Sequence, residues 1–271
     1  MIYFPNAKIN YGLRILNRRE DGYHNLKSAF IPIGWSDVLE VNIDPDITND
    51  NLKFTVKGIE IEGDLENNLV VKAHELLKED FDLPGLEAVL LKNIPTGAGL
   101  GGGSSDGSFM LKAINQLCDL NLTNEQLETY AAKLGSDCPF FIKNRPALVT
   151  GRGEILEELE CQIQSKEILL IHPGIGVSTS EAFALLTPNP TPLDYSQPST
   201  IINDFQDSVC ARVPVVQEAL GFLKNHGAEF TQMTGSGSAV YGLFKIGSVN
   251  GLELVSKAES IGWKAYFGAF L

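Results

Sequence analysis

A glycine-rich segment between residues 95 and 106 constrains this chain more than any other stretch of its 271 residues. It reads Pro-Thr-Gly-Ala-Gly-Leu-Gly-Gly-Gly-Ser-Ser-Asp, with five glycines between Gly97 and Gly103. Missing Cβ atoms let a bulky anion approach the backbone, so that several N–H groups can converge on phosphate oxygens. The apolar run 88–91 predicts a preceding strand, and the following pattern predicts a helix from about Ser105 to Leu117, whose N-terminal dipole favours an anion. The segment therefore predicts an anion-binding loop rather than a flexible turn of small residues.

Three better-known nucleotide-binding loops are excluded, because each lacks a required partner. Residues 97–102 formally satisfy G-x-G-x-x-G, but the next helix leads to Asp119 in a loop and then to another helix, instead of a strand with an acidic end. A Walker A loop requires a lysine before the serine, where this chain has Gly103. A protein-kinase glycine loop requires H-R-D and D-F-G further on, and the sequence contains neither. A phosphate loop of a different kind remains.

Charge and hydropathy limit the classes of partner. Acidic residues exceed basic ones by 34 − 21 = 13, without a basic stripe, so that a nucleic-acid backbone is repelled. No apolar run approaches the ~20 residues that span a bilayer, and the first residues do not resemble a signal peptide. The four cysteines form no CxxC motif, which argues against structural zinc and a disulfide framework. We expect a cytoplasmic protein that binds a small molecule, with no nucleic-acid and no membrane partner; a monomer and a homodimer both remain open.

Hydrophobic periodicity indicates a mixed fold. Alternating apolar residues predict strands within 9–15, 39–43 and 54–56, and apolar residues at helical spacing predict a helix within 69–77. Thr123 and Gln126 predict the capping box of another helix. The second half adds predicted strands at 168–171, 239–244 and 263–267, and helices from about 179 and at 215–223. Mixed order with hairpin-length connections favours the α+β class, and we expect two domains, 1–147 and 148–271.

Four further short segments carry residues suited to chemistry or recognition. Lys8 and Asn10 share one face of a predicted strand, and Tyr23 and His24 follow an Asp-Gly turn. Asp137 stands between a helix end and the apolar run 138–141, which would partly desolvate it, as a useful base requires. Each of these residues alone also fits an ordinary structural role. Lys8 would be a solvated lysine, Tyr23 and His24 a surface aromatic pair, and Asp137 a turn residue. A second glycine-serine segment, 233–239, is either a hairpin turn or another loop that faces the ligand.

Together, these segments resemble the GHMP small-molecule kinases, named for galactokinase, homoserine kinase, mevalonate kinase and phosphomevalonate kinase. The lysine motif, the glycine loop and the Gly-Ser-Gly turn occur in the family's order within residues 5–240. Segments 7–10, 19–24, 99–105 and 134–141 are similar to the branch that phosphorylates a cytidylylated sugar alcohol for non-mevalonate isoprenoid precursors. The resemblance implies a two-domain α+β architecture: an ATP-binding N-terminal domain like ribosomal S5 domain 2, and a ferredoxin-like C-terminal domain.

The resemblance also implies roles for individual residues. Lys8 and Asp137 match the catalytic pair, with Asp137 as the base toward the substrate hydroxyl. The implied substrate-binding residues, of which Tyr23, His24 and Phe183 would hold cytosine, are Asn10, Tyr23, His24 and Phe183. The implied ATP-binding residues are Asn68, Leu69 and Lys92 at adenine and ribose, and Pro95, Thr96, Gly97, Ala98, Gly99, Leu100, Gly101, Gly102, Gly103, Ser104 and Ser105 at the phosphates. ATP and Mg²⁺ are the implied cofactors, and the resemblance leaves the metal ligands unknown.

Two other functions stay open at this point. One is another GHMP kinase, such as homoserine or mevalonate kinase, against which the Tyr23-His24 pair and Phe183 count. The other is a non-enzymatic ligand sensor on the same fold, against which the presence of Lys8 and Asp137 counts. The chain departs from the family pattern mildly, for example at Gly107, where alanine is common.

Overall fold

The computed structural model describes residues 1–61, 63–160, 162–184, 186, 188–191, 193–195 and 200–271. The chain divides into two compact units, each assembled from separate stretches. Unit 1 comprises Met1–Ala7, Trp35–Ile94 and Gly101–Arg145; unit 2 comprises Lys8–Gly34, Pro95–Leu100 and Pro146–Leu271. Both contain helices and strands, which confirms the α+β class. The boundary expected between residues 147 and 148 stays a prediction. Within the described residues, no helix combines the length and the apolar character that crossing a membrane requires.

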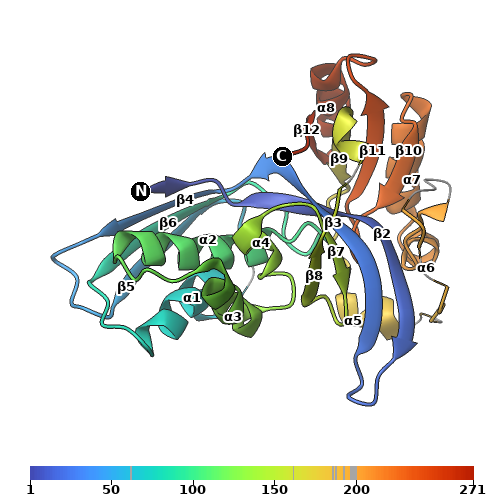
Figure 1. Ribbon diagram of the computed structural model, residues 1–271. Coiled ribbons are helices and arrows are strands. Elements are labelled where there is room, and N and C mark those ends of the chain that lie inside the picture. The colour runs from blue at the N-terminus through green and yellow to red at the C-terminus, as the bar shows by residue number, and fades with distance from the viewer. Residues whose placement is uncertain (62, 161, 185, 187, 192, 196–199) are drawn as a thin grey trace. The chain divides into compact units, whose positions relative to one another are not determined.

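Unit 1 is a four-stranded sheet with helices on one face (Figure 1). Its strand order is β1-β4-β6-β5, and β5 pairs in parallel with β6, Leu52 opposite Leu86. That parallel pair needs a crossover, which α1 supplies. The strands are β1 (Ile2–Tyr3), β4 (Val38–Ile43), β5 (Leu52–Gly58) and β6 (Leu86–Lys92). The helices are η1 (Leu65–Asn67), α1 (Leu69–Lys78), α2 (Gly102–Leu117), α3 (Asn124–Leu134) and α4 (Phe140–Lys143).

The core of unit 1 lies between this sheet and α1 and α2. Alternate residues of β4 and β6, among them Leu39 and Leu90, meet the apolar stripes of the two helices. The helices approach each other unusually closely, because a Cβ atom added at Gly107 of α2 would lie 2.9 Å from Cβ of Leu69 at the start of α1. This contact is the physical reason for glycine at 107, and it places the first turn of α1 against α2.

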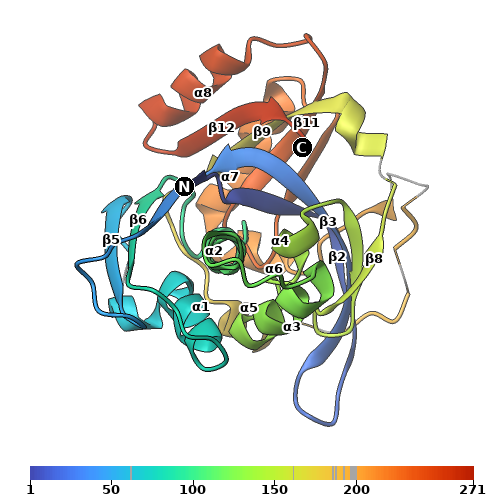
Figure 2. The same cartoon turned by 60° about the vertical axis from the view of Figure 1, so that its left-hand side comes forward.

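Unit 2 holds two further sheets (Figures 1 and 2). One has the order β2-β3-β7-β8, in which the long strands β2 and β3 form a hairpin. The other has the antiparallel order β10-β11-β9-β12. Helices connect β9 to β10 and β11 to β12, whereas β10 and β11 form a hairpin, and this order is the ferredoxin-like arrangement. The strands are β2 (Asn6–Arg18), β3 (His24–Ser36), β7 (Ala147–Thr150), β8 (Ile155–Glu158), β9 (Lys166–His172), β10 (Phe230–Met233), β11 (Val240–Lys245) and β12 (Lys264–Ala269). The helices are η2 (Gln162–Ser165), α5 (Thr179–Ala184), α6 (Gln206–Arg212), α7 (Pro214–Asn225) and α8 (Gly251–Ser260).

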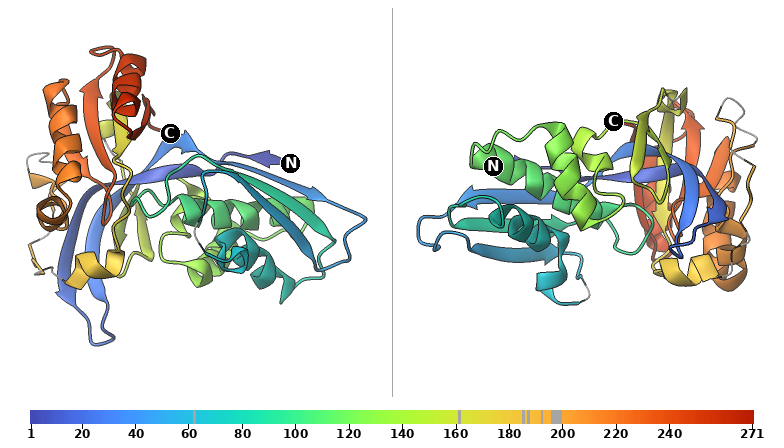
Figure 3. Two further views of the ribbon diagram at one scale, coloured as in Figure 1. Left: turned by 180° about the vertical axis from the view of Figure 1, so that it is seen from behind. Right: turned by 60° about the horizontal axis from the view of Figure 1, so that its bottom comes forward.

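Helices α7 and α8 pack on the β9–β12 sheet (Figure 3), and their apolar residues lie in one core cluster with those of the sheet. Val216, Ala219 and Leu223 of α7 share one buried cluster with Leu254 and Ala258 of α8. The cluster is completed by residues of the sheet, so that the strands predicted at 168–171 and 239–244 are its buried layer. These packed layers give the turns at the ends of β10 and β11 a rigid base.

Local signals are reproduced closely in the structure. Thr123 Oγ1 accepts the N–H of Gln126, and Gln126 Oε1 accepts the N–H of Thr123, which confirms the capping box. The helix expected from about Ser105 begins instead at Gly102. Gly101 takes the left-handed conformation with φ 71°, and its carbonyl accepts the N–H of Ser105 at 2.9 Å, so that the glycines themselves form the first turn.

Candidate active site

Lys8 is held by the glycine loop within unit 2. Its side chain lies on β2 and is buried, only 3% exposed. Nζ donates to Asn10 Oδ1 at 2.6 Å and to the carbonyl oxygen of Gly99 at 3.2 Å, and it stands 4.5 Å from the ring centroid of Phe30. The two-residue period of the strand puts Lys8 and Asn10 on one face, as the sequence predicts. A positive charge is therefore fixed against the loop rather than left in solvent.

The turn at 234–239 packs on the same loop. Thr234 Oγ1 accepts the N–H of Asn10 at 2.9 Å and donates to the Gly99 carbonyl at 3.2 Å. The N–H of Ala239 donates to the carbonyl of Ala98 at 3.2 Å. Both strands that the turn joins, β10 and β11, are antiparallel partners, so the segment is a hairpin turn. It also supports the glycine loop, while its contact with a ligand stays a prediction.

Backbone geometry explains why Gly99 must be glycine. A Cβ atom at this position would lie 2.2 Å from the carbonyl oxygen of Thr234, far inside van der Waals contact. The turn itself is anchored by Asn203, whose Nδ2 donates to the carbonyls of Met233 and Gly235 at 2.8 and 2.9 Å. Sequence reasoning missed both Asn203 and Thr234 as supports of the loop. Only the position of Thr234 within the second glycine-serine segment gave a signal.

In unit 1, a buried ion triad joins the two residues that flank the loop. Lys92, at the end of β6, bonds Asp106 Oδ2 at 2.8 Å and also Asp37 Oδ2. Asp37 Oδ1 accepts the N–H groups of Asn93 and Ile94 at 2.5 and 2.8 Å. Lys92 precedes the glycine loop, and Asp106 lies in α2 directly after it. The triad therefore fastens the strand end to the helix start.

The charges of the triad are mutually dependent. Burial opposes the charge on Lys92, but Asp106 and Asp37 outweigh burial, so that the pKa of Lys92 is raised. Burial raises the pKa of Asp106 well above its usual range, and Lys92 only partly offsets this. The implied contact of Lys92 with adenine or ribose stays a prediction. In the structure its ammonium points to the two carboxylates.

The remaining implied nucleotide residues lie around α1 and α2. Asn68 caps α1, with Oδ1 accepting the N–H of Val70 at 2.9 Å, and Leu69 forms the close contact with α2 described above. At the start of α2, the carbonyl of Ser104 accepts the hydroxyl of Ser108 at 2.8 Å. Ser105 Oγ is buried, with no hydrogen-bond partner among the described residues. These positions surround the first turn of α2, and their contacts with ATP stay predictions.

Asp137 lies in the turn between α3 and α4 and is partly exposed. The hydroxyl of Ser108 donates to the carbonyl of Cys138 at 2.7 Å, which fastens this turn to α2. Burial raises the pKa of Cys138 to about 11, so that the neighbouring thiol stays protonated at neutral pH. Asp137 belongs to unit 1 and Lys8 to unit 2, and their action as a catalytic pair stays a prediction.

The aromatic residues gather in unit 2 near the start of β3. The His24 ring stacks on Phe183 of α5, with centroids 5.1 Å apart and planes 24° apart. Phe183 in turn meets the edge of Phe205 at 4.8 Å. Tyr23 is 58% exposed, and the guanidinium carbon of Arg152 stands 5.0 Å from its ring centroid. The structure thus brings His24 and Phe183 together and adds Arg152, which no sequence signal had singled out.

Comparison with known proteins gives consistent matches. Residues 68–145 match the GHMP kinases N-terminal domain. The chain is 47% identical over 258 residues to the 4-diphosphocytidyl-2-C-methyl-D-erythritol kinase of Bacteroides thetaiotaomicron, covering 90% of this chain and 92% of that protein. A crystal structure of 4-(cytidine 5'-diphospho)-2C-methyl-D-erythritol kinase aligns with a TM-score of 0.80 at 29% identity, over 100% of this chain and 99% of that one. Mevalonate kinase from Methanococcus jannaschii aligns with a TM-score of 0.69 at 12% identity, over 100% and 98% of the two chains, a likeness of fold alone.

Proposed function

The chain belongs to the 4-diphosphocytidyl-2-C-methyl-D-erythritol kinase family of GHMP kinases, and we propose that it phosphorylates the 2-hydroxyl of that cytidylylated alcohol. It is an ATP-dependent small-molecule kinase of isoprenoid precursor synthesis. The observation that carries the proposal is the meeting of Lys8, Gly99 and Thr234 in unit 2. Three motifs far apart in the sequence form one support for a phosphate loop.

Phosphoryl transfer needs positioning and charge neutralisation more than covalent chemistry. The glycine loop would offer backbone N–H groups to the phosphates, and α2, which begins at Gly102, would add the positive end of its dipole. ATP would enter as its Mg²⁺ complex, in which phosphate oxygens and water supply most ligands and the protein adds one or two oxygens. The buried hydroxyl of Ser105, which lacks a partner among the described residues, suits a hard-oxygen contact of this kind.

Lys8 and Asp137 would divide the chemistry at the acceptor. Asp137 would take the proton of the attacking hydroxyl as general base, and Lys8 would reduce the negative charge that grows on the transferred group. The bonds from Lys8 to Asn10 and Gly99 support this role, since they fix its ammonium beside the phosphate loop. Asn10 would then contact the substrate from the same strand face.

Recognition of cytosine would fall to the aromatic residues of unit 2. A base offers a π-face for stacking and a polar edge for hydrogen bonds. Tyr23 presents an exposed ring, and the stacked pair of His24 and Phe183 supplies two more aromatic faces and a polar ring edge. We expect His24 to leave Phe183, or to pair with it as a single wall, when cytosine binds.

The decisive experiment is an ADP-release assay with ATP and four acceptors: the cytidylylated alcohol, free methylerythritol, homoserine and mevalonate. We expect turnover with the cytidylylated compound alone. Lys8→Met should abolish this turnover in a protein that still unfolds in one cooperative transition in the absence of nucleotide. Equal turnover of homoserine or mevalonate would support another GHMP kinase, and no turnover of any acceptor by a folded protein would support a ligand sensor.

A further inference from the structure

Two surface turns meet around Tyr23 in unit 2. One is the β2–β3 turn, which carries Tyr23, and the other joins β7 to β8. The N–H of Leu26 donates to the carbonyl of Gly151 at 2.8 Å, which ties β3 to the second turn. Gly151 has φ 69°, and a Cβ atom there would lie 2.8 Å from the carboxylate of Glu154. Glycine at this position therefore lets the Glu154 carboxylate fold back over its own turn.

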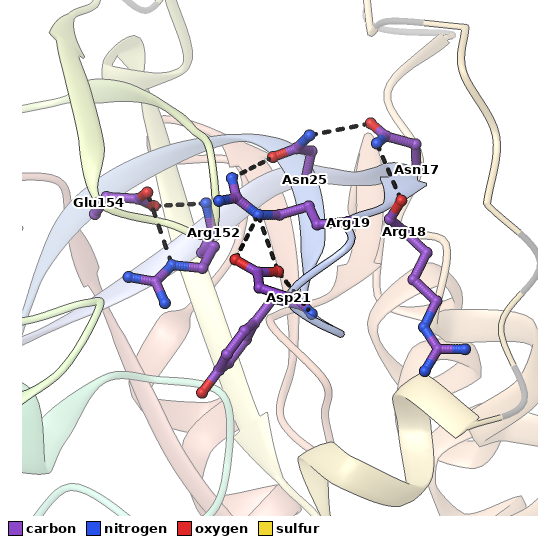
Figure 4. Close-up of polar contacts among 8 residues, drawn as sticks. Asn17, Arg18, Arg19, Asp21, Asn25, Arg152 and Glu154 are labelled. Carbon is purple, nitrogen blue, oxygen red and sulfur yellow. Dashed lines mark hydrogen bonds and ion pairs between the residues drawn. The ribbon is translucent and has the colours of Figure 1, made fainter.

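Within the turn that joins β7 to β8, the Glu154 carboxylate contacts Arg152 (Figure 4). Its Oε2 accepts the backbone N–H of Arg152 at 2.5 Å, and its Oε1 stands 3.8 Å from Nε of the same residue. With the side chain directed in this way, the guanidinium carbon lies 5.0 Å from the ring centroid of Tyr23, a cation–π distance. Glu154 thus fixes the backbone N–H and Nε of Arg152, and the guanidinium stacks on the Tyr23 ring.

Residues of the β2–β3 turn fix the backbone of Tyr23. Asp21 Oδ1 accepts the N–H of Tyr23 at 3.1 Å. The same carboxylate pairs with Nε of Arg19 at 3.2 and 3.0 Å, and Arg19 also donates to Asn25 on β3 at 3.1 Å (Figure 4). These contacts set the turn but leave the Tyr23 side chain free to rotate about its own bonds. Among the described residues, the Arg152 guanidinium contacts the Tyr23 ring and restrains its rotation.

We propose that Arg152 is a positioning residue for substrate recognition: it covers one face of the Tyr23 ring and holds the opposite face ready for cytosine. The inference rests on the proposed function, in which Tyr23 stacks on the base. Tyr23 is 58% exposed, so its ring would otherwise lose rotational freedom on binding, and restraining it beforehand removes part of that cost. Arginine suits the position, because its planar guanidinium stacks on an aromatic face where a lysine offers only a point charge.

A double-mutant cycle tests this inference. Arg152→Ala should raise KM for the cytidylylated substrate about two- to tenfold, the usual cost of ordering a side chain on binding, without changing kcat or KM for ATP. In a Tyr23→Ala background, the same change should have no further effect, because the ring to be positioned is gone. Arg152→Lys should fall between alanine and wild type. A role in fold stability alone would not produce a rise in one KM that depends on Tyr23.

Arg18 is the matched control, since it is an exposed arginine on β2 whose backbone carbonyl, rather than its guanidinium, accepts a hydrogen bond from Asn17. Arg18→Ala removes the same charge and should leave KM unchanged; an equal rise in KM would overturn the inference in favour of a general charge effect. An equal loss from Arg152→Ala with and without Tyr23 would also overturn it, because Arg152 would then contact the substrate directly. If Tyr23→Ala has no effect, the proposed cytosine site fails; if Tyr23→Ala lowers kcat/KM and Arg152→Ala does not, only the positioning role fails.

Discussion

Gly97 and Gly99 provide a matched pair for measuring how tightly the glycine loop is packed. Both have positive φ, 63° and 77°, so that alanine at either position bears the left-handed cost of ~1–2 kcal/mol. Their surroundings differ. A Cβ atom at Gly97 has nothing within 4 Å, whereas one at Gly99 would lie 2.2 Å from the carbonyl oxygen of Thr234. The difference between the two alanine variants therefore isolates the contact of the loop with the 234–239 turn.

The expected magnitude follows from that geometry. A distance of 2.2 Å is more than 1 Å short of ordinary contact, so Gly99→Ala must displace the loop or the turn. Overpacking of this kind typically costs ~1–3 kcal/mol beyond the conformational cost. At ~2–4 °C per kcal/mol for a chain of this size, Gly99→Ala should melt about 2–12 °C below Gly97→Ala.

Differential scanning calorimetry without nucleotide is the appropriate assay, because it avoids any direct clash of the new methyl groups with ATP. In a second measurement, Gly99→Ala should also lower kcat/KM about 100-fold, the usual cost of displacing a binding group by 1 Å. Equal melting temperatures for the two variants would refute the reasoning. They would mean that Thr234 does not support the loop at Gly99.

Three further outcomes are expected. Asp137→Asn should lower kcat roughly 10²–10⁴-fold with little change in KM in steady-state ADP release, and a loss below about tenfold would contradict a general base. Lys92→Met leaves two buried carboxylates uncompensated and should lower the free energy of unfolding by about 3–5 kcal/mol in denaturant titrations; an unchanged midpoint would contradict the triad. Burial lowers the pKa of Lys112 to about 8 from 10.5, so the unfolded chain binds more protons between these values. The stability of the wild type relative to Lys112→Met should therefore increase as pH rises through this window, whereas a constant difference would exclude burial of the charged lysine.

The features predicted correctly from sequence are those that a short window contains. Alternation over 39–43 and the capping box at Thr123 depend on neighbours within a few residues, and both appear in the structure. Helix α8 was not predicted, although Leu254 and Ala258 are buried at helical spacing and Asn250 caps its first turn; Leu252, which is 80% exposed, obscures the apolar pattern. Its position is determined by tertiary packing, since a Cβ atom at Gly251 would lie 1.9 Å from the ring of Phe267.

The candidate site divides in the same way. The glycine loop and the Tyr23-His24 pair are contiguous, so sequence patterns identify them. The triad is different, because Lys92 lies 55 residues from Asp37 and 14 from Asp106, and no local pattern links three separate charges. Sequence similarity alone therefore gave Lys92 a role at the nucleotide, without showing which partners its ammonium has. Arg152 was not predicted either, because its contact with Tyr23 forms only where the β2–β3 turn meets the β7–β8 turn in the folded protein.

The support of the glycine loop by Thr234 has a consequence for how the protein is made. Thr234 is 135 residues beyond Gly99 and 224 beyond Asn10, so these contacts close very long loops and form late in folding. On the ribosome, the loop emerges long before the strand pair β10–β11 that holds it. A nascent chain that ends before this hairpin should therefore keep the backbone of its glycine loop unsupported, and nucleotide could stabilise the protein only after β10 and β11 have been synthesised.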